Sequence, residues 1–274
     1  MDMAYSFSLF CILSENGKSS VLWGKLTSMC RSSSYFLVLC LIVAFAHIPT
    51  TRAQATAGSA ALFESRSIVD MPTAGVLPVS TYCLGIRIAP QGNLTADFSA
   101  TIFKNFNLAL TSTARNAISA APVEVLMPAI SARFRLVDEK RTFPAIAIGI
   151  SSRSNGLFSQ EYLQSHSMSG WISISKNFRS PLGATALHGG FYGGAHALAG
   201  YAGVEQSVGP TIALLPEIVL ASPDATNTLQ VVMNLGARWS VSRGVTIEIL
   251  AHDLTGTIST TVGRSFGVEV IRAW

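Results

Sequence analysis

The sequence predicts an all-β protein, a closed antiparallel transmembrane β-barrel of about twelve strands preceded by a cleavable signal peptide. Three observations lead to this prediction. The chain ends in a strand with strict period-two alternation, a short apolar run near the amino terminus precedes a small-x-small tripeptide, and the remainder is apolar overall without any long apolar run. Together they favour a chain that crosses a membrane with strands rather than with helices.

The carboxy-terminal pattern runs from Val262 to Trp274. One face carries Val262, Phe266, Val268, Val270 and Trp274, and the other carries Gly263, Ser265, Gly267, Glu269 and Ala273. Such alternation over about 9–11 residues is what a tilted transmembrane strand needs, although Arg264 and Arg272 interrupt the apolar face. The segment resembles the terminal signature of bacterial outer-membrane barrels. The resemblance implies that Phe266, Val268, Val270 and Trp274 form an assembly signal read by the barrel assembly machinery.

The amino terminus, residues 1–55, reads as an extension and a secretory signal peptide. Residues 35–46 form an apolar core that is shorter than the roughly 20 residues of a spanning helix, and Ala53-Gln54-Ala55 supplies a cleavage site near 55/56. The mixed polarity of residues 1–28 is unusual ahead of a signal peptide, so we expect translation to start at Met29. The alternative is an anchor helix that remains attached.

The composition of residues 56–274, the part expected to be exported, limits the kinds of partner that we expect for it. Removing residues 1–55 takes away four basic and two acidic residues, so a balance of 19 against 15 becomes 15 against 13. This balance, without any run of Lys or Arg, excludes nucleic acid as an expected partner. Only Cys83 of the four cysteines remains, so no disulfide framework can form within the chain. Charged residues make up 12%, whereas a soluble domain has about a quarter, and we expect lipid to cover much of the surface.

After the cleavage site, residues 56–78 lack a sustained period and are predicted to be a periplasmic lead-in, and residues 79–274 form the barrel. The predicted strands are 79–89, 93–103, 105–114, 129–137, 143–152, 167–178, 182–193, 196–206, 210–221, 228–241, 244–254 and 261–274. The clearest alternation lies in 94–102 and 229–239. Short connections such as Lys104-Asn105 and long ones such as Arg115–Pro128 fall on opposite ends, which predicts both termini in the periplasm.

Seven charged residues fall on the predicted inner face, namely Asp97, Arg133, Arg135, Glu217, Arg238, Glu248 and Glu269. Ionised groups of both signs inside a barrel pair with one another, because an uncompensated charge away from water is costly. One reading is therefore a packed network that fills a narrow lumen. The other is a selective aqueous path lined by Arg133, Arg135 and Arg238, and about twelve strands do not decide between them.

The histidines predict no catalytic role. His166, His188, His196 and His252 have no serine two residues away, the spacing that would place a nucleophile and its base side by side on one strand face. His252 and Asp253 are adjacent, so they point to opposite faces of a strand. Histidine pairs at metal-ligand spacing and phosphate loops are absent from the sequence. We expect neither an enzyme nor a cofactor or metal.

Several short segments of the sequence resemble those of a known family. Asp70–Gly75, Phe143–Gly149, Ile174–Phe178 and Leu187–Gly190 are similar to segments of the YjbH-like outer-membrane barrels that are linked to exopolysaccharide export. The resemblance covers most of residues 68–274 and implies a shared architecture. It supplies no catalytic residues, and it implies polysaccharide or export-complex proteins as partners.

The sequence as a whole predicts a porin-like barrel in the outer membrane of a Gram-negative-type bacterium, exported through the general secretory route, with a structural or transport-related role. A membrane-located barrel hydrolase is the first alternative, and it would need a converging His, Ser and acid cluster at one rim. A soluble secreted β-sandwich is the second. In a sandwich, the apolar faces of 94–102 and 229–239 would pack on each other in a dry core.

Overall fold

The computed structural model describes residues 63–152, 168–180, 183–194, 197–223, 229–257 and 262–274. The predicted signal peptide, His166 and His196 lie outside the described residues. Within them the chain is all β apart from one short 3₁₀ turn, Pro90–Gly92. No helix in this part of the chain is long and apolar enough to cross a membrane.

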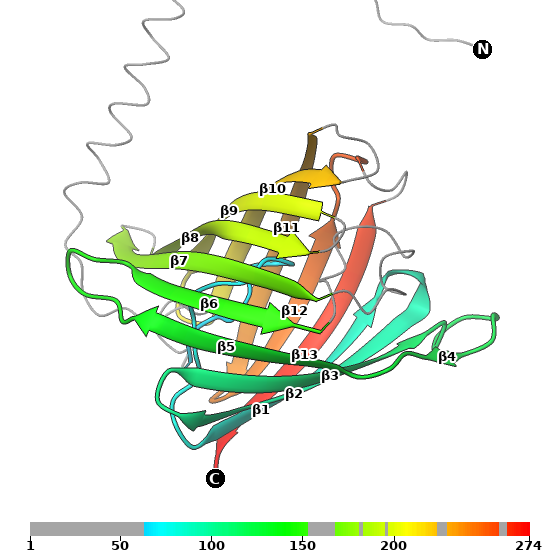
Figure 1. Cartoon of the computed structure of the whole chain (residues 1–274), viewed down its shortest axis with the longest axis horizontal. Helices are drawn as coiled ribbons and strands as arrows, with labels where there is room; N and C mark the ends of the chain where they lie inside the picture. Colours follow the sequence, from blue (N-terminus) through cyan, green and yellow to red (C-terminus); the bar gives the residue numbers. More distant parts are fainter. Residues whose placement is uncertain (1–62, 153–167, 181–182, 195–196, 224–228, 258–261) are drawn as a thin grey trace, which may run out of the picture. The chain divides into compact units, whose positions relative to one another are not determined.

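A ring of antiparallel strands forms the wall of a barrel (Figure 1). The strands are β1 (Thr81–Ala89), β2 (Asn93–Phe103), β3 (Phe106–Arg115), β5 (Ala129–Val137), β6 (Ala145–Ser151), β7 (Ser169–Ser180), β8 (Gly183–Gly194), β9 (Ala197–Val208), β10 (Ile212–Pro223), β11 (Gln230–Ser242), β12 (Val245–His252) and β13 (Gly263–Ala273). Each strand pairs with its neighbours in the ring, and β1 pairs with both β2 and β13. The prediction of a closed antiparallel barrel of twelve strands is confirmed.

One additional strand, β4 (Glu124–Val125), lies in the connection that the sequence predicts as a loop between β3 and β5. It pairs with the end of β3, where Arg115 contacts Glu124 at 3.4 Å. Several connections at the other end of the barrel are tight turns, and they use positive φ angles at Asn105 (65°), Gly209 (74°) and Gly244 (74°). These turns allow adjacent strands to reverse within a few residues.

The outer surface of the wall is apolar along every strand. Exposed large side chains include Leu84, Ile86, Phe98, Leu110, Ile130, Ile148, Ile172, Ile174, Phe191, Leu198, Leu214, Leu220, Met233, Leu235, Ile249 and Phe266. The faces of 94–102 and 229–239 therefore point outward and do not pack on each other, so the β-sandwich alternative is wrong. Arg264 and Arg272 lie on the outer face, each next to an end of β13.

Exposed aromatic side chains gather on the outer surface at the end of the barrel that carries the tight turns. The exposed Phe103, Trp239 and Trp274 lie at or near the ends of β2, β11 and β13, and the half-buried Tyr82 lies at the start of β1. The rings of Tyr82 and Trp274 stack, with centroids 6.1 Å apart and an interplanar angle of 11°.

Residues 63–78, which we call the inner segment, lie inside the barrel (Figure 1). This corrects the prediction of a periplasmic lead-in over 56–78, as far as that segment is described. The sequence shows no period there because the segment is not a strand of the wall. Its backbone reverses between Ser67 and Pro72, where Ile68 donates to the carbonyl of Met71 at 2.8 Å.

The apolar side chains of the inner segment pack against an apolar sector of the inner wall. Ile68, Val69 and Met71 are at most 1% exposed. They pack with side chains on the inner face of β8, β9, β10, β11 and β12. The inner face is thus not uniformly polar. Burial of this apolar surface is favourable and holds the segment against one side of the wall.

We call the wall residues of this contact the apolar sector; they are Tyr192, Ala199, Tyr201, Leu215, Val219, Ala221, Val232 and Leu250. Two glycines, one in the wall and one in the inner segment, allow the close approach of backbone and side chains beside the apolar sector. A Cβ atom built on Gly203 of β9 would lie 2.8 Å from Cδ1 of Ile68. A Cβ atom on Gly75 would lie 1.9 Å from the carbonyl oxygen of Ser65, so this close approach within the segment needs glycine.

Candidate functional site

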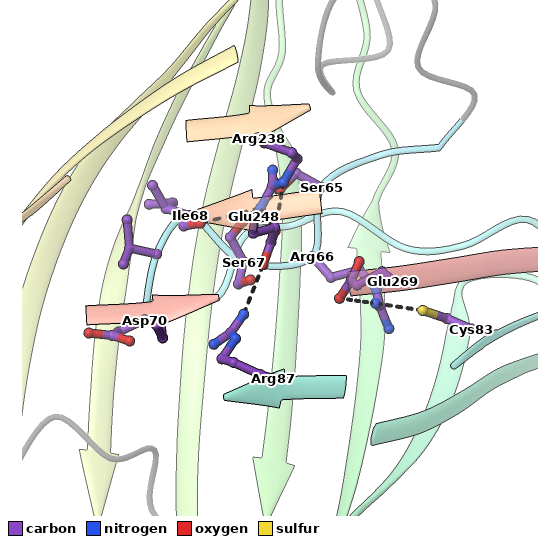
Figure 2. A network of polar contacts seen from close by, with 12 residues as sticks. Ser65, Arg66, Ser67, Ile68, Asp70, Cys83, Arg87, Arg238, Glu248 and Glu269 are labelled. Atoms are coloured by element: carbon purple, nitrogen blue, oxygen red, sulfur yellow. Dashed lines mark hydrogen bonds and ion pairs between the residues drawn. The ribbon is translucent and has the colours of Figure 1, made fainter. Parts of the chain in front are cut away.

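The candidate site is the polar contact between the inner segment and the inner face of the wall. Figure 2 shows its centre, where Ser65, Arg66, Ser67 and Ile68 of the segment approach Arg87, Arg238, Glu248 and Glu269 of the wall. The alternation of each strand points these wall residues inward, and the segment brings backbone groups and side chains to meet them. Four groups of contacts make up the site.

The first group centres on Arg66 of the inner segment. Its guanidinium forms an ion pair with Glu269 of β13 at 2.8 Å. It also donates to the hydroxyl of Ser99 on β2 at 2.5 Å. Its contact with the thiol of Cys83 on β1, at 3.0 Å, is drawn in Figure 2. Arg66 therefore ties the segment to the three strands around which the ring closes.

The second group centres on Arg238 of β11, whose side chain is 6% exposed. It lies 3.2 Å from the carboxylate of Glu205 and 2.7 Å from that of Glu248. It also donates to the hydroxyl of Ser65 and, at 3.1 Å, to the carbonyl of Ser67. Glu248 in turn accepts from Arg87 at 3.0 Å (Figure 2). Buried charges of both signs compensate one another here.

The third group centres on Glu217 of β10, which is 3% exposed. Its carboxylate accepts hydrogen bonds from the backbone N–H groups of Val69, Asp70 and Met71 at 3.0–3.2 Å. The side-chain amide of Asn234 donates to it at 2.7 Å. A single wall carboxylate thus satisfies the backbone donors of the turn in the inner segment, which would otherwise be buried without partners.

The fourth group is formed by two arginines of β5. Arg133 donates to the carbonyl of Gly75 at 2.7 Å, and its guanidinium lies 4.7 Å from the ring centroid of Trp171. Arg135 donates to the carbonyl of Ala74 at 2.9 Å and forms an ion pair with Glu64. Both arginines therefore hold the carboxy-terminal half of the segment, and Arg135 also neutralises Glu64 at its amino-terminal end.

The structure places all seven charged residues named from the sequence on the inner side of the wall. Six of them contact the inner segment or a residue that does, as described above. The seventh, Asp97 of β2, instead accepts from the hydroxyl of Thr111 on β3 at 2.6 Å. In the described part of the chain, Arg133, Arg135 and Arg238 contact the inner segment, and Arg238 also contacts two buried carboxylates.

Sequence reasoning missed Arg66 and Asp70, since the segment that carries them was assigned to the periplasm. It also missed Arg87, which lies between Ile86 and Ile88, and Glu205, which follows Val204. Counting inward positions on every strand, instead of only on the clearest ones, would have found these two.

Among the described residues, two histidine–serine pairs lie inside the barrel. Nε2 of His252 on β12 lies 2.6 Å from the hydroxyl of Ser265 on β13, and its Nδ1 lies 2.9 Å from the carboxylate of Asp70. Nδ1 of His188 on β8 lies 2.8 Å from the hydroxyl of Ser175 on β7, which also accepts from the backbone N–H of Ala74. The sequence argument searched for serine on the strand of the histidine itself, and both serines lie on the adjacent strand.

No cluster of three or more His, Cys, Asp or Glu side chains in the described part of the chain is suited to hold a metal ion. Among the same residues, Cys83 is the free cysteine and is buried. Its described contact is with Arg66, within the network above.

Comparison with known proteins gives distant likenesses only. No family model matches the chain, and no curated protein matches it. Among solved structures, a KdgM porin is 8% identical with a TM-score of 0.44, over 71% of this chain and 99% of that one. A NanC porin is 8% identical with a TM-score of 0.42, over 71% and 98%. OprB of Pseudomonas putida is 10% identical with a TM-score of 0.35, over 70% and 91%.

Proposed function

We propose that the chain is a porin-like outer-membrane β-barrel with a transport-related role, in which the inner segment closes the lumen. The observation that carries the proposal is the contrast between the two sides of one closed wall. The outer side is apolar on every strand, with aromatic side chains at one end, as a lipid-facing surface requires. The inner side carries charges that are paired with, or bonded to, a separate segment of the chain.

Outer-membrane lipid and the barrel assembly machinery are the partners that this proposal requires. Export through the general secretory route, with cleavage near residue 55, belongs to the same proposal. In a closed ring each strand pairs its backbone groups with two neighbours, which is the condition for spanning a bilayer with strands.

The inner segment is the proposed gate, because many of its contacts with the wall are hydrogen bonds and ion pairs. Replacing Glu217 with Ala removes the acceptor of three backbone N–H groups of the segment. We expect the intact protein to conduct rarely in planar bilayers and the Glu217→Ala variant to open more often. Glu124→Ala, which changes an exposed carboxylate outside the barrel interior, is the matched control. Equal conductance of folded intact and Glu217→Ala protein would reject the gate.

We further propose an acidic carbohydrate polymer as the cargo, in line with the resemblance to the YjbH-like barrels. Displacement of the inner segment would take the carbonyl partners from Arg133 and Arg135 and the carboxylate of Glu64 from Arg135. The opened path would then present the cationic side chains of Arg133 and Arg135 along β5, which favour anions on that side of the lumen. Export-complex proteins are the partners expected with such a cargo.

Ion selectivity tests the cargo class. The Glu217→Ala barrel should prefer anions and be blocked by an acidic oligosaccharide more strongly than by a neutral one of equal length. Adding Arg133→Glu to it should reverse or abolish the anion preference, because the charge of the lining sets the local preference for counter-ions. Equal block by the acidic and the neutral oligosaccharide would contradict an acidic cargo while leaving the gate intact.

A further inference from the structure

Three side chains from separate parts of the sequence form a line inside the barrel. The carboxylate of Asp70 in the inner segment lies 2.9 Å from Nδ1 of His252. Nε2 of the same ring lies 2.6 Å from the hydroxyl oxygen of Ser265. A carboxylate on one ring nitrogen and a serine hydroxyl on the other is the arrangement that activates serine as a nucleophile in unrelated folds.

The wall and the segment both hold this line in place. His252 pairs with Gly263 in the ladder between β12 and β13, so Ser265 is its diagonal neighbour on the same face. Asn234 of β11 donates to the carboxylate of Asp70 at 3.1 Å, and its own carbonyl oxygen accepts from the backbone N–H of Asp253 at 2.8 Å. The orienting carboxylate is thus itself oriented.

We propose that Ser265, His252 and Asp70 form a hydrolytic site for short-chain acyl esters carried on hydrophilic molecules. Ser265 is the nucleophile, His252 the general base, and Asp70 the group that fixes the imidazole with its proton on Nδ1. This activity goes beyond the proposed transport role and does not depend on it. The sequence predicted no catalysis, and the cluster is the feature that its hydrolase alternative required.

The chemistry needs only the ester and water. The Ser265 hydroxyl gives its proton to Nε2 of His252 as its oxygen bonds to the ester carbonyl carbon. The bond from that carbon to the alcohol oxygen then breaks, and Nε2 returns the proton to the leaving alcohol. Water next gives a proton to Nε2 and adds its oxygen to the acyl carbon. The bond to Ser265 breaks, and the serine recovers the proton, which leaves a carboxylic acid.

A cation lies on the same inner face. Arg87 of β1 pairs in the ladder with Gly267, two residues from Ser265, and its guanidinium donates to Glu248 at 3.0 Å. Arg87 is thus a diagonal neighbour of Ser265 across the ladder, and its guanidinium, although paired with Glu248, favours the negative charge that develops on the carbonyl oxygen during attack. We assign Arg87 this electrostatic role.

The surroundings select the substrate class. Ser265 is 5% exposed, whereas the side chains of His252 and Asp70 are 18% and 21% exposed, so the imidazole and the carboxylate are the more accessible members of the line. A Cβ atom built on Gly263 would lie 3.0 Å from Pro90 and 3.4 Å from His252, which leaves little room for a large acyl group. Charged and polar side chains surround the site, so a hydrophilic carrier fits better than a lipid.

The test begins with the unaltered protein, folded in detergent, and a small fluorophosphonate probe read by mass spectrometry. We expect covalent labelling at Ser265 and slow hydrolysis of p-nitrophenyl acetate, with little hydrolysis of p-nitrophenyl palmitate. Ser265→Ala and His252→Gln should abolish both signals. Asp70→Asn should lower hydrolysis by about 10³–10⁴-fold, because it favours the wrong imidazole tautomer.

Ser240→Ala is the matched control, since it removes another buried inner-face hydroxyl, on β11, and should leave labelling and hydrolysis unchanged. The heat-dependent gel mobility of each variant reports whether its barrel is folded. Absence of label at Ser265 in the folded, unaltered protein would overturn the proposal without any variant. Hydrolysis that persists in folded Ser265→Ala would also overturn it.

Discussion

At the scale of single residues, Arg238 of β11 connects β9, β12 and the inner segment through the contacts of its side chain. It lies between two buried carboxylates, Glu205 and Glu248, and it also donates to the inner segment. Removing one member of a buried charge cluster leaves the others uncompensated, which costs more than the net worth of the cluster. The stability of the barrel should therefore depend strongly on this side chain.

We predict that Arg238→Met destabilises the folded barrel by about 3–5 kcal/mol, as loss of one partner from a buried ion pair does. Arg264→Met, on the exposed outer face near one end of β13, should change stability little. Thermal unfolding of both variants, followed by gel mobility, checks the prediction. Equal unfolding temperatures for the two variants would mean that Glu205 and Glu248 find other partners.

The position of a side chain can be predicted from the sequence when it depends only on the residues next to it in the chain. Glu217 and Glu248 follow from alternation, because a strand sends every second residue to the same face. Asp70 could not be placed in this way, since its position depends on contacts with Asn234 and His252, far along the chain. Likewise, the pairing of His252 with Ser265 depends on the register between two strands, which alternation alone does not fix.

At the scale of the strand, the outward face of β11 tests the membrane assignment. Leu235 lies near the middle of this strand and Val241 near its end, and both are exposed. We predict that Leu235→Arg destabilises the folded barrel in lipid vesicles by about 2–4 kcal/mol, and that Val241→Arg destabilises it by about 0–1 kcal/mol. The difference arises because a cation at the bilayer midplane is far from water. Folding yields that do not depend on position along the strand would contradict the lipid-facing assignment.

The last strand carries the predicted assembly signal. The backbone N–H of Trp274 donates to the carbonyl of Ser80 at 3.1 Å, and its ring stacks on Tyr82. We predict that deletion of Trp274 leaves the chain unassembled and sensitive to protease in the periplasm, whereas Trp274→Phe assembles. The reason is that an aromatic ring at the interface is retained in the second variant only. Normal amounts of heat-modifiable barrel in membranes of cells making the truncated chain would count against the signal.

The sequence predicts wall strands better than it predicts what fills the barrel. Even the Gly/Ala-rich strands β8 and β9 lie where their weak alternation places them. The interior is different, because its packing depends on side-chain volumes. Gly236 of β11 faces inward as expected, yet a Cβ atom there would lie 2.7 Å from Cδ2 of Leu250. An inward position is therefore not the same as an open one, and only the arrangement of neighbouring strands shows the difference.

At the scale of the whole molecule, the apolar exterior governs how the protein behaves in solution. We predict that the purified chain folds only with detergent or lipid and that its folded form migrates differently from the boiled form on a gel. Lipid or detergent must cover the exposed side chains of the wall, because a soluble monomer rarely exposes a continuous apolar surface of this kind. A monodisperse, folded protein in plain buffer would reject the membrane-spanning barrel.

The pairing of β1 with β13 also has a consequence for the order of events during folding. Glu269 meets Arg66 across 203 positions of the chain, so the wall cannot close before the last strand has been synthesised. The finished ring leaves the inner segment no lateral entrance, so after closure it can reach the lumen only through an end of the barrel. Contacts between such distant residues form slowly. Until they form, β1 and β13 offer two unpaired edges to other chains, and the protein depends on chaperones to keep those edges apart.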